Sequence, residues 1–90
     1  MDINSIVMQS KEIDATDLNG DTVMMNLEKG KYFALNSIGS RIWELIDEKK
    51  VVNQVIDELL EEYEVDKETC VETVIIFLNR LKDEELIKVF

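Results

Sequence analysis

The sequence predicts an α+β domain: a three-stranded antiparallel sheet followed by three helices, in a winged-helix-like arrangement. Alternating apolar residues and glycine turns occupy the first third of the chain, and apolar residues at helical spacing occupy the rest. Ninety residues make one domain. We expect it to comprise residues 12–90, with residues 1–11 as a lead-in or as part of the first strand.

The first hairpin is predicted from its turn. Residues 12–17 and 22–27 alternate in polarity, and Asn19 and Gly20 lie between them. Asn-Gly favours a two-residue turn with positive φ at both positions, which is the strongest short-range hairpin signal. These two segments are therefore expected to be paired antiparallel strands.

The third strand is expected at residues 31–35, after a turn closed by Gly30 in the left-handed region. It completes an antiparallel meander and lies at its edge. An edge strand exposes unpaired N–H and C=O groups, and proteins usually protect such edges with charges or proline. Only Lys31 offers such protection here. The strand is thus a candidate for pairing with an extended peptide beside an apolar helix.

Three helices follow. Asn36 is a suitable N-cap for the first helix, and residues 52–63 carry the apolar stripe of the second. Asp66 is a suitable N-cap for the third helix, which should end near Asp83, and residues 87–90 are expected to form a short apolar tail. The short connection between the second and third helices is typical of a helix-turn-helix pair.

The composition argues against catalysis and against binding to nucleic acids or membranes. The formal charge is −10, which disfavours contact with phosphates or with anionic lipid. The chain has no histidine, and Cys70 lies on an apolar helix face, where an inert thiol is expected. The acids around Asp17 lack the glycine and glutamate spacing of a calcium loop. We therefore expect no enzyme activity, metal or cofactor. The sequence shows no signal-peptide pattern and no long apolar run, so we expect a cytoplasmic location.

The chain resembles a known family in two stretches. GKYFALNSIGSRIWELI at residues 30–46 and EYEVDKETCVETVIIFLNRLKDEELI at residues 62–87 are similar to the signature of PqqD-like proteins. The resemblance covers about residues 12–87, and it is most like the stand-alone B1 proteins of lasso-peptide biosynthesis. Asp66, Phe77, Leu78, Leu81 and Leu86 stand in family-like places, whereas Glu85 replaces a glycine that many relatives carry.

The resemblance implies a function and a site. PqqD-like domains are recognition elements for ribosomally made, post-translationally modified peptides: they bind the leader of a precursor as an added β-strand and present it to a separate modifying enzyme. In lasso pathways that enzyme is a leader peptidase. By resemblance, the peptide-binding residues are Lys31, Tyr32, Phe33, Ala34 and Leu35 on the strand and Thr73, Val74, Phe77, Arg80 and Leu81 on the third helix. The opposite helix edge, with Ile75 and Asn79, is the competing wall, and residues 36–39 are expected to cap and pack.

Three alternatives remain open from the sequence. The peptide pathway could instead use a radical enzyme, as in pyrroloquinoline quinone or sactipeptide synthesis. The helix pair permits a winged-helix DNA-binding regulator, although the charge disfavours it. The chain could also be an adaptor that binds only a folded partner, through the isolated Ile76.

Overall fold

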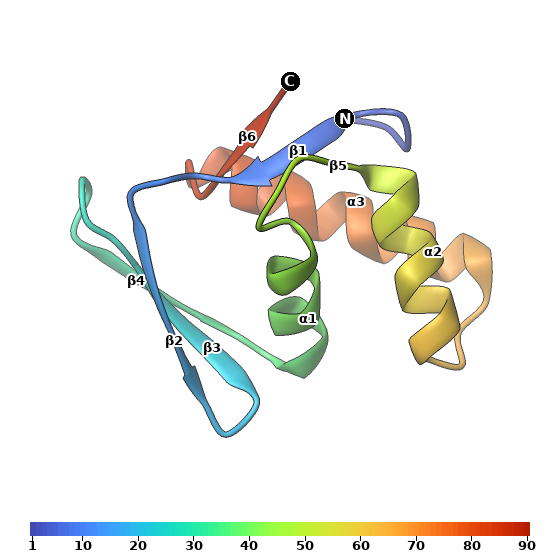
Figure 1. Ribbon diagram of the computed structural model, residues 1–90, viewed down its shortest axis with the longest axis horizontal. Coiled ribbons are helices and arrows are strands. Elements are labelled where there is room, and N and C mark those ends of the chain that lie inside the picture. Colours follow the sequence, from blue (N-terminus) through green and yellow to red (C-terminus); the bar gives the residue numbers. More distant parts are fainter.

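The computed structural model describes all residues, 1–90, and contains two small antiparallel sheets and three helices (Figure 1). The expected α+β class is confirmed. The elements in chain order are β1 (Ile6–Gln9), β2 (Ile13–Leu18), β3 (Asp21–Asn26), β4 (Lys31–Leu35), α1 (Ser37–Leu45), β5 (Lys50–Val51), α2 (Val52–Glu62), α3 (Lys67–Asp83) and β6 (Ile87–Val89).

The expected meander forms one sheet, with strand order β2-β3-β4. Asn19 and Gly20 both have positive φ, 57° and 91°, as the two-residue turn requires. Gly30 adopts φ 67° in the second turn. The two glycine turns therefore set the register of this sheet, which pairs Leu18 with Asp21 and Met24 with Phe33.

The second sheet was not expected. Its strand order is β5-β1-β6, so it joins the beginning, the middle and the end of the chain. Ile6 pairs with Val51, and Val7 pairs with Val89. The apolar tail predicted at residues 87–90 is thus mostly a strand, and residues 6–9 of the expected lead-in are also a strand, in which Val7 is fully buried.

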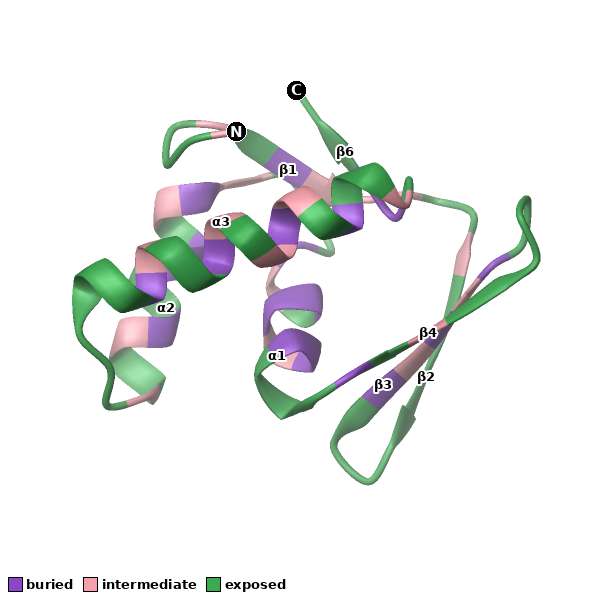
Figure 2. Cartoon of the chain, turned by 180° about the vertical axis from the view of Figure 1, so that it is seen from behind, coloured by how far each residue is buried: buried purple, intermediate pink, exposed green.

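The core lies where the helices meet both sheets (Figure 2). Helix α1 packs on the meander, α2 packs on α3, and α3 contacts β6. The largest fully buried side chains come from every layer: Val7, Met24, Ile42, Ile46, Val52, Val55, Ile56, Val74, Leu78 and Leu86. Burying one such side chain contributes roughly 1.5–3 kcal/mol, so this shared core holds the two sheets in fixed positions.

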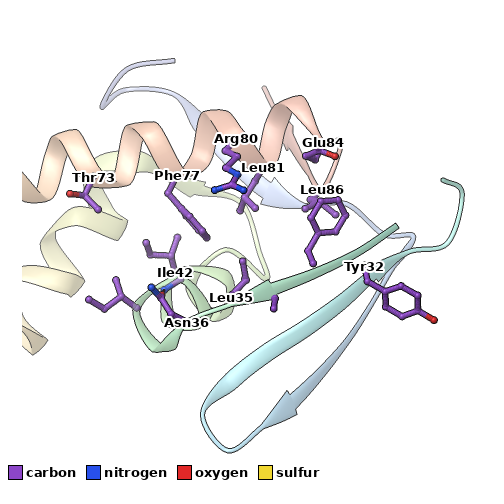
Figure 3. A pocket seen from close by; sticks show the side chains of 14 residues that line it. Tyr32, Leu35, Asn36, Ile42, Thr73, Phe77, Arg80, Leu81, Glu84 and Leu86 are labelled. Atoms are coloured by element: carbon purple, nitrogen blue, oxygen red, sulfur yellow. The ribbon is translucent and has the colours of Figure 1, made fainter. Parts of the chain in front are cut away.

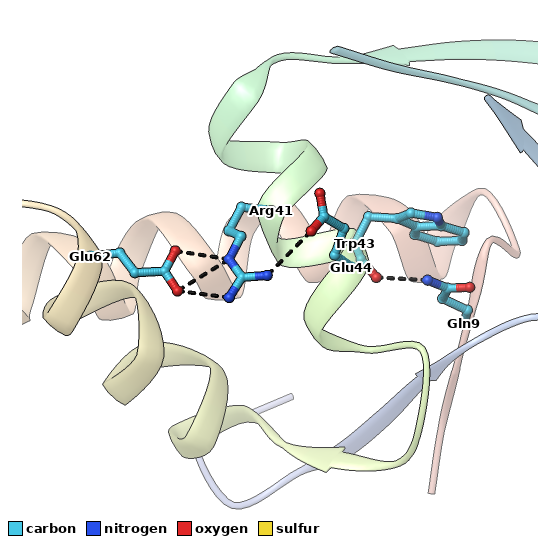
Figure 4. A network of polar contacts seen from close by, with 5 residues as sticks. All are labelled: Gln9, Arg41, Trp43, Glu44 and Glu62. Atoms are coloured by element: carbon cyan, nitrogen blue, oxygen red, sulfur yellow. Dashed lines mark hydrogen bonds and ion pairs between the residues drawn. The ribbon is translucent and has the colours of Figure 1, made fainter. Parts of the chain in front are cut away.

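Helix α1 is also tied to its neighbours by polar contacts (Figure 4). The Arg41 guanidinium donates to both carboxylate oxygens of Glu62 on α2, with the shortest distance 2.8 Å. These hydrogen bonds lower the pKa of Glu62 and raise the pKa of Arg41. Gln9 Nε2 donates to the carbonyl oxygen of Trp43 at 2.7 Å. The contacts fix α1 against α2 on one side and against β1 on the other.

Candidate functional site

A groove of about 480 Å³ lies between β4 and α3, and the start of α1 forms its third side (Figure 3). Most of its lining is apolar. The lining residues are Tyr32, Phe33, Ala34, Leu35, Asn36, Ile38, Gly39, Ile42, Thr73, Phe77, Arg80, Leu81, Glu84 and Leu86.

One wall of the groove is the open edge of β4. A two-residue turn closes with a hydrogen bond between its flanking residues, here Leu18 and Asp21, and bonded pairs alternate with non-bonded pairs along an antiparallel ladder. By this parity, the backbone groups of residues 31, 33 and 35 face β3, and those of Tyr32 and Ala34 face outward. No hydrogen bond within the chain reaches these outward groups. Two N–H and two C=O groups therefore line the groove without a partner.

The start of α1 shapes the floor. The side chain of Asn36 accepts a hydrogen bond from the Gly39 N–H at 2.8 Å, which confirms it as the N-cap. Gly39 lies against the Phe77 ring: a Cβ at this position would be 3.2 Å from ring atoms Cε1 and Cζ. Because Gly39 has no side chain, the Phe77 ring can pack directly against the backbone of α1. Ile38, next to it, remains 43% exposed beside the groove.

Ser40 on α1 connects the helix to strands β3 and β4. Its hydroxyl accepts a hydrogen bond from the Thr22 N–H at 2.8 Å and donates to the Leu35 carbonyl oxygen at 3.2 Å. Thr22 and Leu35 are register partners at the end of the β3–β4 ladder. The buried hydroxyl thus links the two strands at the last pair of their ladder and holds the C-terminal end of β4 against α1.

Polar contacts hold the other end of the groove together. Lys31 on β4 forms an ion pair with Glu84 at 3.7 Å, and Lys29 forms one with Glu85 at 3.4 Å. The buried Asn26 side chain donates to the Glu84 carbonyl oxygen at 3.4 Å. These contacts join the β3–β4 turn to the end of α3 and set the separation of the two walls there.

Helix α3 ends in a Schellman motif, despite the missing glycine. The Leu86 N–H donates to the Leu81 carbonyl oxygen at 2.9 Å, and the Glu85 N–H donates to that of Lys82 at 3.0 Å. Glu85 takes the left-handed conformation, with φ 59°. The departure from the family pattern therefore leaves the helix end in place, and the buried Leu81 and Leu86 close the lower part of the groove.

A smaller apolar cavity of about 280 Å³ adjoins the groove and shares Ile38, Ile42 and Thr73 with it. It lies between the three helices, and Cys70 and Val74 line it. Burial raises the pKa of the Cys70 thiol, and the charge of Asp66 raises it further. A thiol with a raised pKa is a poor nucleophile.

The structure brings together eight of the ten residues that the family resemblance suggested: all but Lys31 and Val74 line the groove. Val74 is buried in the core, and Lys31 reaches the groove only through its ion pair with Glu84. Ile75 and Asn79, the competing wall, do not line it. Sequence reasoning assigned residues 36–39 only to capping and packing, yet Asn36, Ile38 and Gly39 all line the groove.

The fold and groove define a class of protein: a small α+β domain with an open sheet edge facing an apolar helix. The family model described as "Coenzyme PQQ synthesis protein D (PqqD)" matches residues 21–87. This chain therefore belongs to the PqqD family. A comparison with curated protein sequences finds no significant match.

Two solved structures are similar to this chain. One is TbiB1 in complex with the TbiA(β) leader peptide, with a TM-score of 0.84, 32% identity, and coverage of 90% of this chain and 94% of that one. The other is a lasso peptide synthetase B1 complexed with its leader peptide, with a TM-score of 0.74, 18% identity, and coverage of 91% and 96%. The second likeness shows the shared fold only. None of the three helices combines the length and apolar character needed to span a bilayer.

Proposed function

We propose that this protein is a non-catalytic recognition element that binds the leader of a ribosomally made precursor peptide as an added strand on β4. It then presents the peptide to a separate leader peptidase of a lasso pathway, in the cytoplasm where the precursor is made. The unpaired edge of Tyr32 and Ala34, facing an apolar groove, carries this proposal. That edge and groove match what strand addition requires: main-chain partners for register and a lined cavity for side chains.

The energetics favour a guest with apolar side chains. Four main-chain hydrogen bonds at about 0.5–1.5 kcal/mol each contribute only a few kcal/mol. Each apolar guest side chain buried in the groove adds roughly 1.5–3 kcal/mol. After the cost of association, micromolar binding at about −8 kcal/mol needs both contributions. Phe77 and Leu81 line the helix side of the groove and supply the apolar surface that would bury these guest side chains.

The more similar of the two solved structures supports leader binding. The 32% identical chain is itself described in complex with a leader peptide, over nearly the full length of both chains. The family model, by contrast, takes its name from coenzyme PQQ synthesis. A radical-enzyme pathway is therefore the alternative setting for the same peptide-binding role.

Other roles fit the molecule less well. A DNA-binding regulator would bring a chain of formal charge −10 against phosphates. Catalysis has less support, because the chain lacks histidine, the commonest general base, and its one cysteine is buried with a raised pKa. An adaptor role through Ile76, which is 62% exposed on α3, is compatible with leader binding, because delivery requires a second surface.

Fluorescence polarisation with a labelled synthetic leader tests the proposal. The probes are the TbiA(β) leader and the leader of a precursor peptide where the genes neighbouring this chain's gene encode one. We expect saturable binding of at least one probe to the wild type. Failure of both probes to bind would overturn the proposal.

Two variants locate the binding. Ala34→Pro removes an outward N–H without touching the β3–β4 ladder, and Phe77→Glu places a charge in the groove. Both should abolish binding while circular dichroism stays native. Ile76→Glu, on the exposed face of α3, is the matched control and should bind like the wild type. Binding that persists in both groove variants would rule out this groove.

A further inference from the structure

The side of the meander that faces away from the helices carries an apolar strip that is exposed on β4 and half-buried on β3. Residues on β3 and β4 alternate between its two faces, and Met24 and Leu35 point to the buried one. The opposite face carries two cross-strand pairs, Met25 with Tyr32 and Val23 with Ala34. We call these four residues the outer strip.

Tyr32 dominates the outer strip. It is 72% exposed, the highest value among the large apolar residues, and its side chain points away from α3 (Figure 3). Its hydroxyl forms no hydrogen bond within the chain, and helix α1 covers only the other face of the sheet. The ring therefore stands beside the open edge of β4, with no neighbour on the edge side.

We infer that the outer strip is the second half of the peptide site and reads the outward-facing side chains of the guest strand. The inference rests on the proposed function. A strand added to β4 continues the pleat of the sheet, so its side chains alternate between the groove and the outer face. Guest residues beside Phe33 and Leu35 enter the groove, whereas those beside Tyr32 and Ala34 lie on the outer face.

Sheet geometry brings the guest within reach of the Tyr32 ring. Directly opposite residues on one face of an antiparallel pair have Cβ atoms about 4.5–5.5 Å apart, and aromatic rings favour aromatic or β-branched partners there. A guest chain beside β4 would therefore cover the exposed edge of the ring. A site that contacts the guest on both the groove face and the outer face favours a peptide with large side chains on both of its faces. A peptide with a single apolar side chain would bind more weakly.

Charge narrows the class of guest further. Asp14 lies opposite Met25, in the same cross-strand row as Tyr32, and its side chain shares the outer face. The chain as a whole has a formal charge of −10. An acidic guest residue beside Tyr32 would be repelled by Asp14 and by the net negative charge of the chain. It would also lack an apolar side chain to pack against the Tyr32 ring. We expect an aromatic or β-branched guest residue at this position and no acidic one.

The test compares two substitutions of the same ring in the leader titration. Tyr32→Thr removes the ring and introduces a β-branched residue that suits a strand, whereas Tyr32→Phe keeps the ring and removes only the hydroxyl. We expect Tyr32→Thr to weaken leader binding about fivefold, and we expect Tyr32→Phe to retain most of the affinity that Tyr32→Thr loses. Ile76→Thr removes another largely exposed apolar residue, on α3, and is the control that should leave leader binding unchanged.

Substitutions in the leader complete the test. Aspartate placed in turn at consecutive residues of the paired segment should weaken binding at groove-facing and outward-facing positions alike. In Tyr32→Thr, the loss at the outward position beside residue 32 should shrink, because the two changes remove the same contact. This coupling separates direct contact with the ring from a general effect on the strand.

The outcomes separate the inference from the proposed function. If the wild type binds neither leader, the proposed function fails with it. If the wild type binds but Tyr32→Thr stays within twofold and outward aspartates are tolerated, the function stands and the inference is overturned. An unchanged leader affinity together with altered self-association, or with lost binding of the peptidase, also overturns it and assigns the outer strip to a second copy or to the enzyme.

Discussion

Gly39 on α1 and Phe77 on α3 lie against each other, and both line the groove. A Cβ atom at position 39 would lie 3.2 Å from two carbons of the Phe77 ring, closer than an ordinary van der Waals contact. Phe77 is only partly buried, so its ring can yield toward the groove. The glycine thus permits a ring position that leaves the groove open.

Replacing Gly39 by alanine should damage binding more than stability. The added methyl group pushes the Phe77 ring into the groove, while alanine gains about 1 kcal/mol of helix propensity over glycine. We expect leader affinity to fall at least tenfold and the free energy of unfolding to change by less than about 1 kcal/mol. Fluorescence polarisation and urea unfolding measure the two quantities. The double variant Gly39→Ala/Phe77→Leu should regain part of the affinity, and a lack of rescue would argue against ring displacement.

Replacing Ser40 by alanine should destabilise the protein. The Thr22 N–H is buried and donates to the Ser40 hydroxyl, so its removal leaves a buried donor without a partner. Such a loss costs about 1–3 kcal/mol. Urea unfolding should show it, whereas Ser37→Ala, an exposed serine on the same helix, should leave the midpoint unchanged. An unaltered midpoint in Ser40→Ala would mean that Thr22 pairs directly with Leu35 once the hydroxyl is gone.

Replacing Glu85 by glycine should stabilise the protein. Glu85 holds φ 59°, a conformation that costs a residue with a side chain roughly 1–2 kcal/mol and glycine very little. The ion pair with Lys29 that would be lost is largely exposed and contributes little. We expect a gain of about 1 kcal/mol in chemical denaturation. Glu84→Gly, at a negative φ of −89°, is the control and should give no gain.

The cap of α3 should make stability depend on pH in the acid range. Hydrogen bonds from the Thr69 side chain and backbone N–H lower the pKa of Asp66. The ionised Asp66 therefore contributes fully to stability at pH values above its unfolded-state pKa of about 3.9. This contribution is lost as the pH falls through the lower pKa of the folded state. Asparagine caps equally well but does not titrate.

The comparison of wild type with Asp66→Asn isolates this contribution. The two should have nearly equal unfolding free energies at about pH 6, and wild type should lose more than the variant between about pH 4 and pH 2. Parallel pH profiles in urea unfolding would show that the carboxylate adds nothing to the cap.

Local signals in the sequence predicted the meander and the helices. Asn19 and Gly20 specify the first turn, Gly30 the second, and Asn36 and Asp66 the helix starts, because each works through its own backbone neighbours. The second sheet left no such signal. Strand β5 has two residues and β6 has three. Their partners in β1 lie more than forty positions away from β5 and about eighty away from β6.

The candidate site was predictable on the strand and only partly on the helices. Alternation and edge position identify Tyr32 and Ala34, but a broad apolar arc on α3 does not say which edge faces β4. The family resemblance suggests Val74 as a groove residue, whereas the structure buries it in the core. The contribution of α1 was missed, although Gly39 inside a helix was a signal: an interior glycine costs stability unless something approaches its backbone closely.

The pairing of β1 with β6 has a practical consequence for anyone attaching this protein to something else. Val7 pairs with Val89, and the Phe90 N–H donates to the Ile6 carbonyl oxygen at 2.9 Å, so both chain ends emerge from one small sheet (Figure 1). Neither terminal strand supplies a residue to the groove. A tag, a solid support or a fused catalytic module can therefore be joined at either end without covering the groove. The domain could then be used to capture peptides in a new setting.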